Sequence, residues 1–232
     1  MNRYPFKKQW MPKVSLFSAA AMPMRLHMRT DLHLFRKAWH MTMGLLIAFV
    51  YLSGISRTTG VLILGFILAV VLMLEAARLK TPAVNELILR IWGPIMRTNE
   101  VSRMSAIPHY LSATILAVAI FPKPVAILAT LYLALGDPIA SLFGILYGSR
   151  SVRLKNGKSV IGTLAGILTC MVVTVVFLKI QSIPDDTILP LMLVGGLAGG
   201  LAEHVPMDVD DNFTIPIISG FVLWLAFIVL GL

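Results

Sequence analysis

The sequence is poor in charge and in cysteine, and each shortage excludes a class of protein. Charged residues make up 13% of the 232 residues, whereas 57% are hydrophobic and the mean hydropathy is +0.84. Soluble domains carry about 25% charged residues, so an ordinary soluble domain is excluded and a lipid bilayer is expected to surround most of the chain. The single cysteine, Cys170, excludes an intrachain disulfide, and its place within an apolar run predicts a buried, inert thiol.

Acidic residues are scarcer than basic ones, since 11 Asp and Glu stand against 20 Lys and Arg, and the formal net charge is +9. Such an excess can indicate nucleic-acid binding. Here, however, all but three of the basic residues fall within 1–40, 78–105 and 149–159. Basic residues in alternate loops are typical of the cytoplasmic side of a membrane protein, where they also meet anionic headgroups. The sequence therefore predicts no nucleic-acid partner, a cytoplasmic N-terminus and a C-terminus outside.

Long apolar runs dominate the rest of the chain and predict an all-α, polytopic membrane protein. A helix needs about 20 residues to cross the hydrocarbon core. About seven segments approach that length, at 38–56, 59–77, 106–122, 124–147, 160–180, 187–204 and 212–231. The segment 82–97 is instead amphipathic, charged and bracketed by prolines, so it is expected to lie in the membrane interface. We therefore expect a membrane domain over 36–232.

The first 35 residues are basic and contain no apolar stretch long enough for the core of a secretory signal. Their mixture of Lys and Arg with Phe, Trp, Met and Leu is typical of a segment that lies on an anionic membrane surface. A disordered basic tail is the alternative. Met24 and Met28 are also possible translation starts.

Acidic side chains at the ends of apolar runs are the strongest indication of a site. Asp137, Glu203 and Asp211 lie there, and a carboxylate at a helix centre costs about 2.5–3.5 kcal/mol on insertion scales. Such oxygens suit Mg²⁺ that keeps some of its waters and bridges nucleotide phosphates. Pro138 follows Asp137 and removes a helix hydrogen bond, which predicts a broken or re-entrant helix that reaches the cytoplasmic face. Asn212 is a further ligand, for a second metal ion or a base edge.

A short string with a basic residue could be mistaken for a nucleotide-binding loop. Gly157-Lys158-Ser159 resembles the end of a P-loop, but Val152 stands where that pattern needs its first glycine, and no strand precedes it. We therefore exclude a P-loop. Lys158 at the start of an expected helix is still suited to binding phosphate, with positive-inside topology as the alternative explanation for the basic residues around it.

Other polar residues are weaker candidates. His40 is expected to polarise an acceptor hydroxyl or to anchor the chain in the interface. Asp208 and Asp210 are interpreted as solvated loop acids, and Asp185 with Asp186 falls on the opposite face of the membrane.

Small residues repeat at four-residue spacing in several predicted spans, and the spacing leaves two roles open. Such repeats usually let helices pack closely, and this explanation is favoured for 195–200. Along 136–148 a smooth face that admits a nucleotide is equally compatible with the pattern, because Asp137 and Ser141 flank it.

Five strings occur in order over about residues 32–225. They are Arg36-Lys37-x-x-His40, Glu75-x-x-Arg78, Gly136-Asp137-Pro138-x-Ala140-x-x-x-Gly144-x-x-x-Gly148, Lys158-Ser159-x-x-Gly162-Thr163 and Glu203…Asp211-Asn212-x-x-x-Pro216. Together they resemble the CTP-dependent lipid-alcohol kinases, which include dolichol kinase, phytol kinase and CTP-dependent diacylglycerol kinase. The resemblance implies Mg²⁺-dependent transfer of the CTP γ-phosphate to a membrane-embedded alcohol. The sequence departs from the family at Ile161, where relatives carry an acid, and at 145–147, which is apolar where relatives have a basic residue.

The resemblance also assigns roles to residues. The implied catalytic residues are Asp137, Lys158 and Asp211, and the implied metal ligands are Asp137, Glu203 and Asp211. Nucleotide binding is assigned to Gly136, Ala140, Gly144, Gly148, Lys158, Ser159, Gly162, Thr163 and Asn212. Supporting roles fall to Arg36, Lys37, His40, Glu75 and Arg78. CTP, a lipid alcohol and membrane lipids are the expected partners.

Two other functions compete with the kinase. A phosphatidate cytidylyltransferase-like enzyme shares an Asp-x-x-Ala-x-x-x-Gly string but needs more spans than the chain offers. A small transporter or helical scaffold would use polar groups within spans, but no inverted repeat is evident. The lipid alcohol and a possible homo-oligomer stay open, and short loops favour a prokaryotic plasma membrane.

Overall fold

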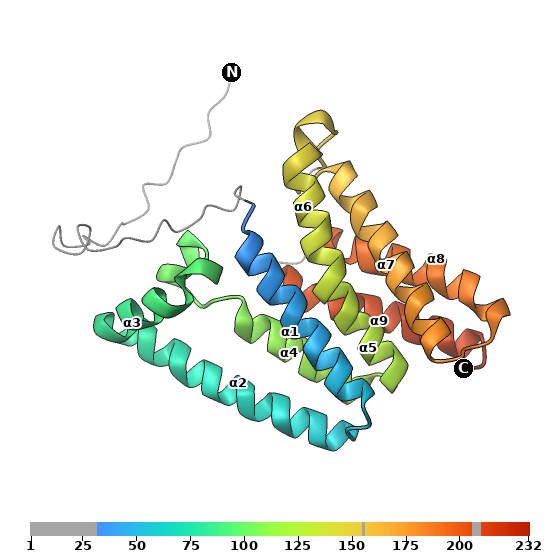
Figure 1. The fold of residues 1–232 in the computed structure, drawn as a ribbon, viewed down its shortest axis with the longest axis horizontal. Coiled ribbons are helices and arrows are strands. Elements are labelled where there is room, and N and C mark those ends of the chain that lie inside the picture. Colours follow the sequence, from blue (N-terminus) through green and yellow to red (C-terminus); the bar gives the residue numbers. More distant parts are fainter. Residues whose placement is uncertain (1–31, 155, 206–209) are drawn as a thin grey trace.

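The computed structural model describes residues 32–154, 156–205 and 210–232, and this part of the chain consists of helices joined by turns and loops, without a β-strand (Figure 1). The prediction of an all-α fold is confirmed. The basic segment 1–31, Lys155 and Asp208 lie outside the described residues. The helices are α1 (Leu34–Leu52), α2 (Arg57–Lys80), α3 (Pro82–Trp92), α4 (Ile107–Ile120), α5 (Lys123–Leu131), α6 (Asp137–Tyr147), α7 (Val160–Ile180), α8 (Asp185–Leu201) and α9 (Asp211–Val229).

Five helical stretches in the described part of the chain are long and apolar enough to cross a membrane. They are Arg57–Lys80, Lys123–Arg150, Val160–Ile180, Asp185–His204 and Asp211–Val229. The remaining two predicted spans correspond to α4, which has 14 residues, and to α1, which carries Arg36, Lys37 and His40 in its first turns. Each predicted span thus coincides with a helical stretch. Five of these stretches are candidates for crossing the membrane, and a total of seven stays a prediction.

The helices pack as a bundle around a central α5. Every side chain of α5 from Val125 to Thr130 is buried, and α9 packs against α5, α4 and α8. In Figure 1, α2 and α3 form one flank of the bundle, and α7 with α8 forms the other. The predicted interfacial segment 82–97 forms α3 and a short helical turn after it, with Leu87, Ile91 and Trp92 exposed. Its position relative to a membrane stays a prediction.

The chain does not return on itself at Asp137, contrary to the re-entrant helix that the sequence allows. Instead, α5 continues into α6 through one widened π-turn over Tyr132–Gly136. The Asp137 amide donates to the carbonyl of Tyr132, five residues back. The Leu133 carbonyl could accept from the N–H four or five residues later. The Asp137 N–H is already bonded to Tyr132, and Pro138 has no N–H, so the Leu133 carbonyl lacks a donor within its own helix. The break therefore leaves one main-chain acceptor for a side chain from elsewhere.

Small residues allow α6 and α7 to pack with their backbones in contact. A Cβ added at Gly162 would lie 2.7 Å from the Ala140 carbonyl oxygen and 3.1 Å from the Gly144 Cα. At Gly148 an added Cβ would lie 3.2 Å from the Ser159 Cβ. The face of 136–148 that the sequence offers equally to packing and to a nucleotide is therefore occupied by α7.

We predict that Gly162→Ala destabilises the protein, because the clashing atoms belong to backbone and cannot move aside. Overpacking of this kind costs about 1–3 kcal/mol. The matched control is Gly65→Ala in α2, since an added Cβ there meets nothing within 4 Å. Thermal unfolding in detergent should show a lower midpoint for Gly162→Ala alone. Equal midpoints for the two variants would contradict the packing role.

Candidate active site at the start of α6 and α9

A cavity of about 250 Å³ lies where the beginnings of α1, α6 and α9 meet the second short helical turn after α3, Thr98–Val101, and Arg97 before it. Its lining is almost wholly polar. The residues that form it are Arg36, His40, Arg97, Asn99, Asp137, Asp210, Asp211 and Asn212. Of these, the sequence predicts Arg36, His40, Asp137, Asp211 and Asn212 as site residues, and the fold brings all five together.

The widened turn before α6 sets the position of both Asp137 and His40. Asp137 is the first residue of α6 and is half-buried at the cavity wall. The Nε2 atom of His40 lies 3.0 Å from the Leu133 carbonyl oxygen that the turn leaves without a helical partner. A carbonyl oxygen only accepts, so Nε2 carries the proton. In the neutral ring, Nδ1 is therefore the atom that can accept a proton.

Asp210 belongs to the site, and its interpretation as a solvated loop acid is wrong. It is the N-cap of α9, and its carboxylate accepts hydrogen bonds from the backbone N–H and the side-chain amide of Asn212. Asp210 and Asp211 both line the cavity at the positive end of the helix, which stabilises negative charge. Asp directly before an apolar helix is a preferred N-cap residue, so the sequence could have indicated this capping role, although not the place of Asp210 at the cavity.

Lys158 stands behind Asp211 and is absent from the residues that line the cavity. Its ammonium donates to the Asp211 carboxylate at 2.9 Å, to the Glu203 carboxylate at 2.8 Å and to the Glu203 carbonyl at 3.3 Å. Burial alone would lower the pKa of Lys158, but the Glu203 and Asp211 carboxylates raise it above its ordinary value. Lys158 therefore stays charged and joins the start of α7 to the end of α8 and the start of α9.

The other residues of the Lys158 string have structural partners. The hydroxyl of Ser159 caps α7 by accepting from the Gly162 amide at 3.1 Å. The hydroxyl of Thr163 lies 2.8 Å from Nε2 of His204, and Nδ1 of His204 lies 2.8 Å from the Asn156 side chain. His204, which the sequence did not single out, thus fastens the loop before α7 to the end of α8.

The predicted triad of metal ligands does not converge. No group of three His, Cys, Asp or Glu side chains in the described ranges is close enough to hold a metal ion. Asp137 and Asp211 both line the cavity, whereas Glu203 does not and is paired with Lys158. A cation at this site would therefore rest on few protein ligands and keep most of its waters.

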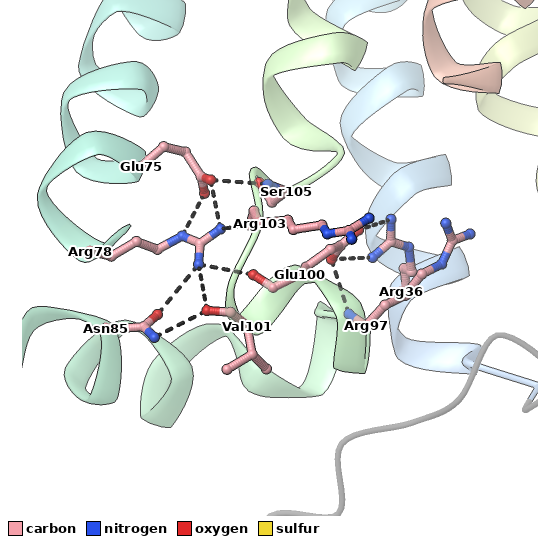
Figure 2. Close-up of polar contacts among 9 residues, drawn as sticks. All are labelled: Arg36, Glu75, Arg78, Asn85, Arg97, Glu100, Val101, Arg103 and Ser105. Carbon is pink, nitrogen blue, oxygen red and sulfur yellow. Dashed lines mark hydrogen bonds and ion pairs between the residues drawn. The ribbon is translucent and has the colours of Figure 1, made fainter. Parts of the chain in front are cut away.

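Glu75 and Arg78 lie outside the cavity, in a separate buried cluster (Figure 2). Arg78 is 1% exposed and forms a two-point ion pair with Glu75, with N–O distances of 2.6 and 2.9 Å. Figure 2 shows that the cluster extends to Glu100, whose carboxylate binds Arg36. Lys37 points elsewhere and donates to the Leu32 carbonyl at 2.8 Å.

Arg97 and Asn99 are site residues that the sequence did not identify. Both come from the turn that follows α3, where no motif marks them. Together with Arg36 they complete a cavity that combines three carboxylates, two amides and two guanidinium groups. Carboxylate and amide oxygens suit a hard divalent cation, and guanidinium groups suit phosphate. The arrangement can therefore bind a metal-chelated polyphosphate.

Comparison with known proteins gives four relatives. CTP-dependent diacylglycerol kinase 1 of Eremothecium gossypii is 33% identical over 204 residues, which is 79% of this chain and 64% of the relative. The Saccharomyces cerevisiae protein of the same name is 28% identical over 79% of this chain and 70% of the relative. Farnesol kinase, chloroplastic, of Arabidopsis thaliana is 30% identical over 45% of this chain and 36% of the relative. No family model and no solved structure matches. The chain thus spans less than two thirds of the Eremothecium protein.

Proposed function

We propose that this chain belongs to the family of CTP-dependent lipid kinases, to which the names of its relatives point, and that it transfers the γ-phosphate of CTP to the hydroxyl of a membrane-embedded lipid alcohol. The observation that carries the proposal is the cavity itself, which Asp137 and Asp211 line together with Arg36 and Arg97. Acidic and basic groups around one cavity are what a phosphoryl-transfer site needs, because its catalysis is mostly positioning and charge stabilisation.

The donor set fits Mg²⁺. Asp137, Asp210, Asp211, Asn99 and Asn212 offer carboxylate and amide oxygens around one cavity. We expect Asp137 and Asp211 to hold the ion, which when bound would neutralise charge on the nucleotide phosphates. Glu203 would act through Lys158 by holding Asp211 in place. Ala140 and Gly144 of α6, the flanking Gly136 and Gly148, and Gly162 of α7 would support the site by close packing.

We propose that the arginines of the cavity bind the nucleotide phosphates. Arg36 and Arg97 line the same cavity as the carboxylates, and we expect their guanidinium groups to neutralise charge on the transferring phosphoryl group. Lys158 is engaged by Glu203 and Asp211, and we propose that it orients Asp211 rather than binding phosphate directly. We assign no partner to the cytosine base. The proposal that CTP is the phosphate donor rests on the names of the relatives.

The acceptor hydroxyl would enter laterally from the membrane, between helices. Its oxygen attacks the γ-phosphorus, the bond from that phosphorus to the bridging oxygen breaks, and CDP leaves. The hydroxyl proton passes to a base at the cavity wall, either the Asp137 carboxylate or Nδ1 of His40, whose Nε2 is committed to Leu133. The names of the relatives suggest diacylglycerol or farnesol as acceptors.

The basic residues give the orientation that we propose. Arg36 and Arg97 belong to the two longest basic segments, so the cavity would open to the cytoplasm with seven helices crossing the membrane. A prokaryotic plasma membrane stays a prediction from loop length, since the relatives named here come from eukaryotes.

The test uses purified full-length protein in lipid nanodiscs with Mg²⁺ and CTP labelled at the γ- or the α-phosphate. The lipids offered are diacylglycerol, farnesol, phytol, dolichol and phosphatidate. We expect label from the γ-phosphate to appear on an alcohol. Label from the α-phosphate on phosphatidate would identify a cytidylyltransferase instead. No transfer from either CTP or ATP would refute a kinase and favour a transporter or scaffold.

A further inference from the structure

Glu100 is a buried carboxylate that no sequence motif marks, yet it contacts a wall of the cavity. Its side chain is held between two basic residues of separate segments, and the whole residue is 5% exposed. The two Glu100 oxygens accept from Nη1 and Nη2 of Arg36 at 2.9 and 3.0 Å, which is a two-point pair. One of them also accepts from the Arg97 backbone N–H at 3.0 Å. Glu100 thus touches both arginines that line the cavity.

The backbone of Glu100 is fixed in turn by the Glu75–Arg78 pair (Figure 2). Arg78 donates to the carbonyl oxygens of Glu100 at 2.9 Å and Arg103 at 2.6 Å. Glu75 accepts from the Ser105 N–H at 3.0 Å. Arg78 also donates to the Val101 carbonyl at 3.4 Å, so the pair on α2 holds the segment from 100 to 105 through four hydrogen bonds. A continuous set of hydrogen bonds thus connects α2 through this segment to the Arg36 guanidinium.

The cavity creates a need for such a connection. Asp137, Asp210 and Asp211 line it together with Arg36, and a mobile guanidinium would pair with one of these carboxylates. That pair would remove a ligand from the cation and a charge from the phosphates. Glu100 instead engages both Nη atoms of Arg36, and the Ile95 carbonyl accepts a further hydrogen bond from Nη1 at 2.9 Å. Charge-assisted, two-point pairs hold the geometry of a guanidinium most firmly.

We propose that Glu100 is a positioning residue, which holds the Arg36 guanidinium at the cavity wall in the orientation that binds the nucleotide phosphates. Glu75 and Arg78 extend this role by fixing the backbone of Glu100. The inference rests on the proposed function for what Arg36 binds, whereas the positioning of Arg36 by Glu100 is a property of the fold.

The kinetic test compares Glu100→Gln with Arg36→Ala and with the double variant. Glu100→Gln keeps the shape but turns one acceptor into a donor that opposes Arg36, and we expect KM for CTP to rise about tenfold, the scale of a charged hydrogen bond. The double variant should match Arg36→Ala, because Glu100 acts through Arg36. The control is Glu86→Gln, whose exposed pair with Arg90 has no route to the cavity. If Glu100→Gln raised KM for CTP by the same factor in the wild-type and in the Arg36→Ala background, the proposal would be overturned.

A second readout does not depend on turnover. In protein labelled with ¹⁵N-arginine in nanodiscs, a guanidinium held at two points gives separate Nη signals, and Arg36→Lys identifies those of Arg36. We expect these signals to merge in Glu100→Gln and to persist in Glu86→Gln. Unchanged signals in Glu100→Gln would refute the positioning role. If the signals merge in Glu100→Gln but the wild-type protein shows no CTP-dependent transfer, the positioning of Arg36 by Glu100 is established and the proposed function is refuted.

Discussion

Asp137→Asn is expected to reduce γ-phosphate transfer from CTP by about a thousandfold or more while the protein stays folded. The change keeps the shape of a half-buried side chain at the first residue of α6 but removes its charge. Two losses follow, because the carboxylate is both a proposed ligand of Mg²⁺ and a proposed acceptor of the hydroxyl proton. Removing one charge-stabilising contact costs about 10²–10³ in turnover, and general base catalysis contributes about 10²–10⁴.

The measurement is initial-rate transfer of γ-label in nanodiscs, with thermal unfolding of the same samples. Asp186→Asn is the matched control, since Asp186 is an exposed acid in the first turn of α8 and lies outside the cavity. Both variants should unfold near the wild-type temperature. Transfer by Asp137→Asn within a few fold of wild type would remove Asp137 from the mechanism.

Lys158→Met is expected to lower both stability and transfer, because it leaves Glu203 and Asp211 as neighbouring carboxylates without their cation. The Glu203 side chain is 9% exposed and that of Asp211 is 34% exposed. Breaking a fully buried pair costs about 3–5 kcal/mol, so with this partial exposure we expect about 2 kcal/mol of stability to be lost. Transfer should fall about a hundredfold, since Asp211 would no longer be held at the cavity wall.

A double variant separates the two effects of Lys158. Lys158→Met with Glu203→Gln removes the uncompensated buried charge and should recover much of the unfolding temperature, while transfer stays low. Lys179→Met is the control, because its pair with Asp185 is exposed on both sides. If Lys158→Met kept full transfer and changed only the orientation of the protein in the membrane, the basic loop would serve topology alone.

Apart from Arg36 and His40, which the family resemblance supplied, the residues of the cavity could be predicted from sequence where a polar residue interrupts or begins an apolar run. Asp137, Asp211 and Asn212 stand out for that reason, and they do line one cavity. Arg97 and Asn99 could not be found in this way, because they lie in a polar turn where such residues are ordinary. Their role depends on where the turn after α3 is held.

For Lys158 and the small residues of 136–148, the sequence marked the positions but did not predict which groups they contact. A lysine at a helix start suits phosphate, yet the end of α8 brings Glu203 to it first. The smooth face of α6 suits a close approach, yet α7 fills it. In both cases a neighbour distant in sequence takes the interaction that the local pattern leaves open.

Sequence alone determined that this protein is a bundle of apolar helices, that its basic residues gather in particular loops, and which polar groups interrupt the helices. These are properties of short segments, because hydrophobic length, charge and proline placement act within about one helix. Tertiary structure alone decided that Asp210 and Arg97 join the cavity, that Lys158 stands behind it, and that Glu100 connects α2 to Arg36. Such choices depend on how helices far apart in the chain pack, since a buried charge must pair with whichever partner the packing places beside it.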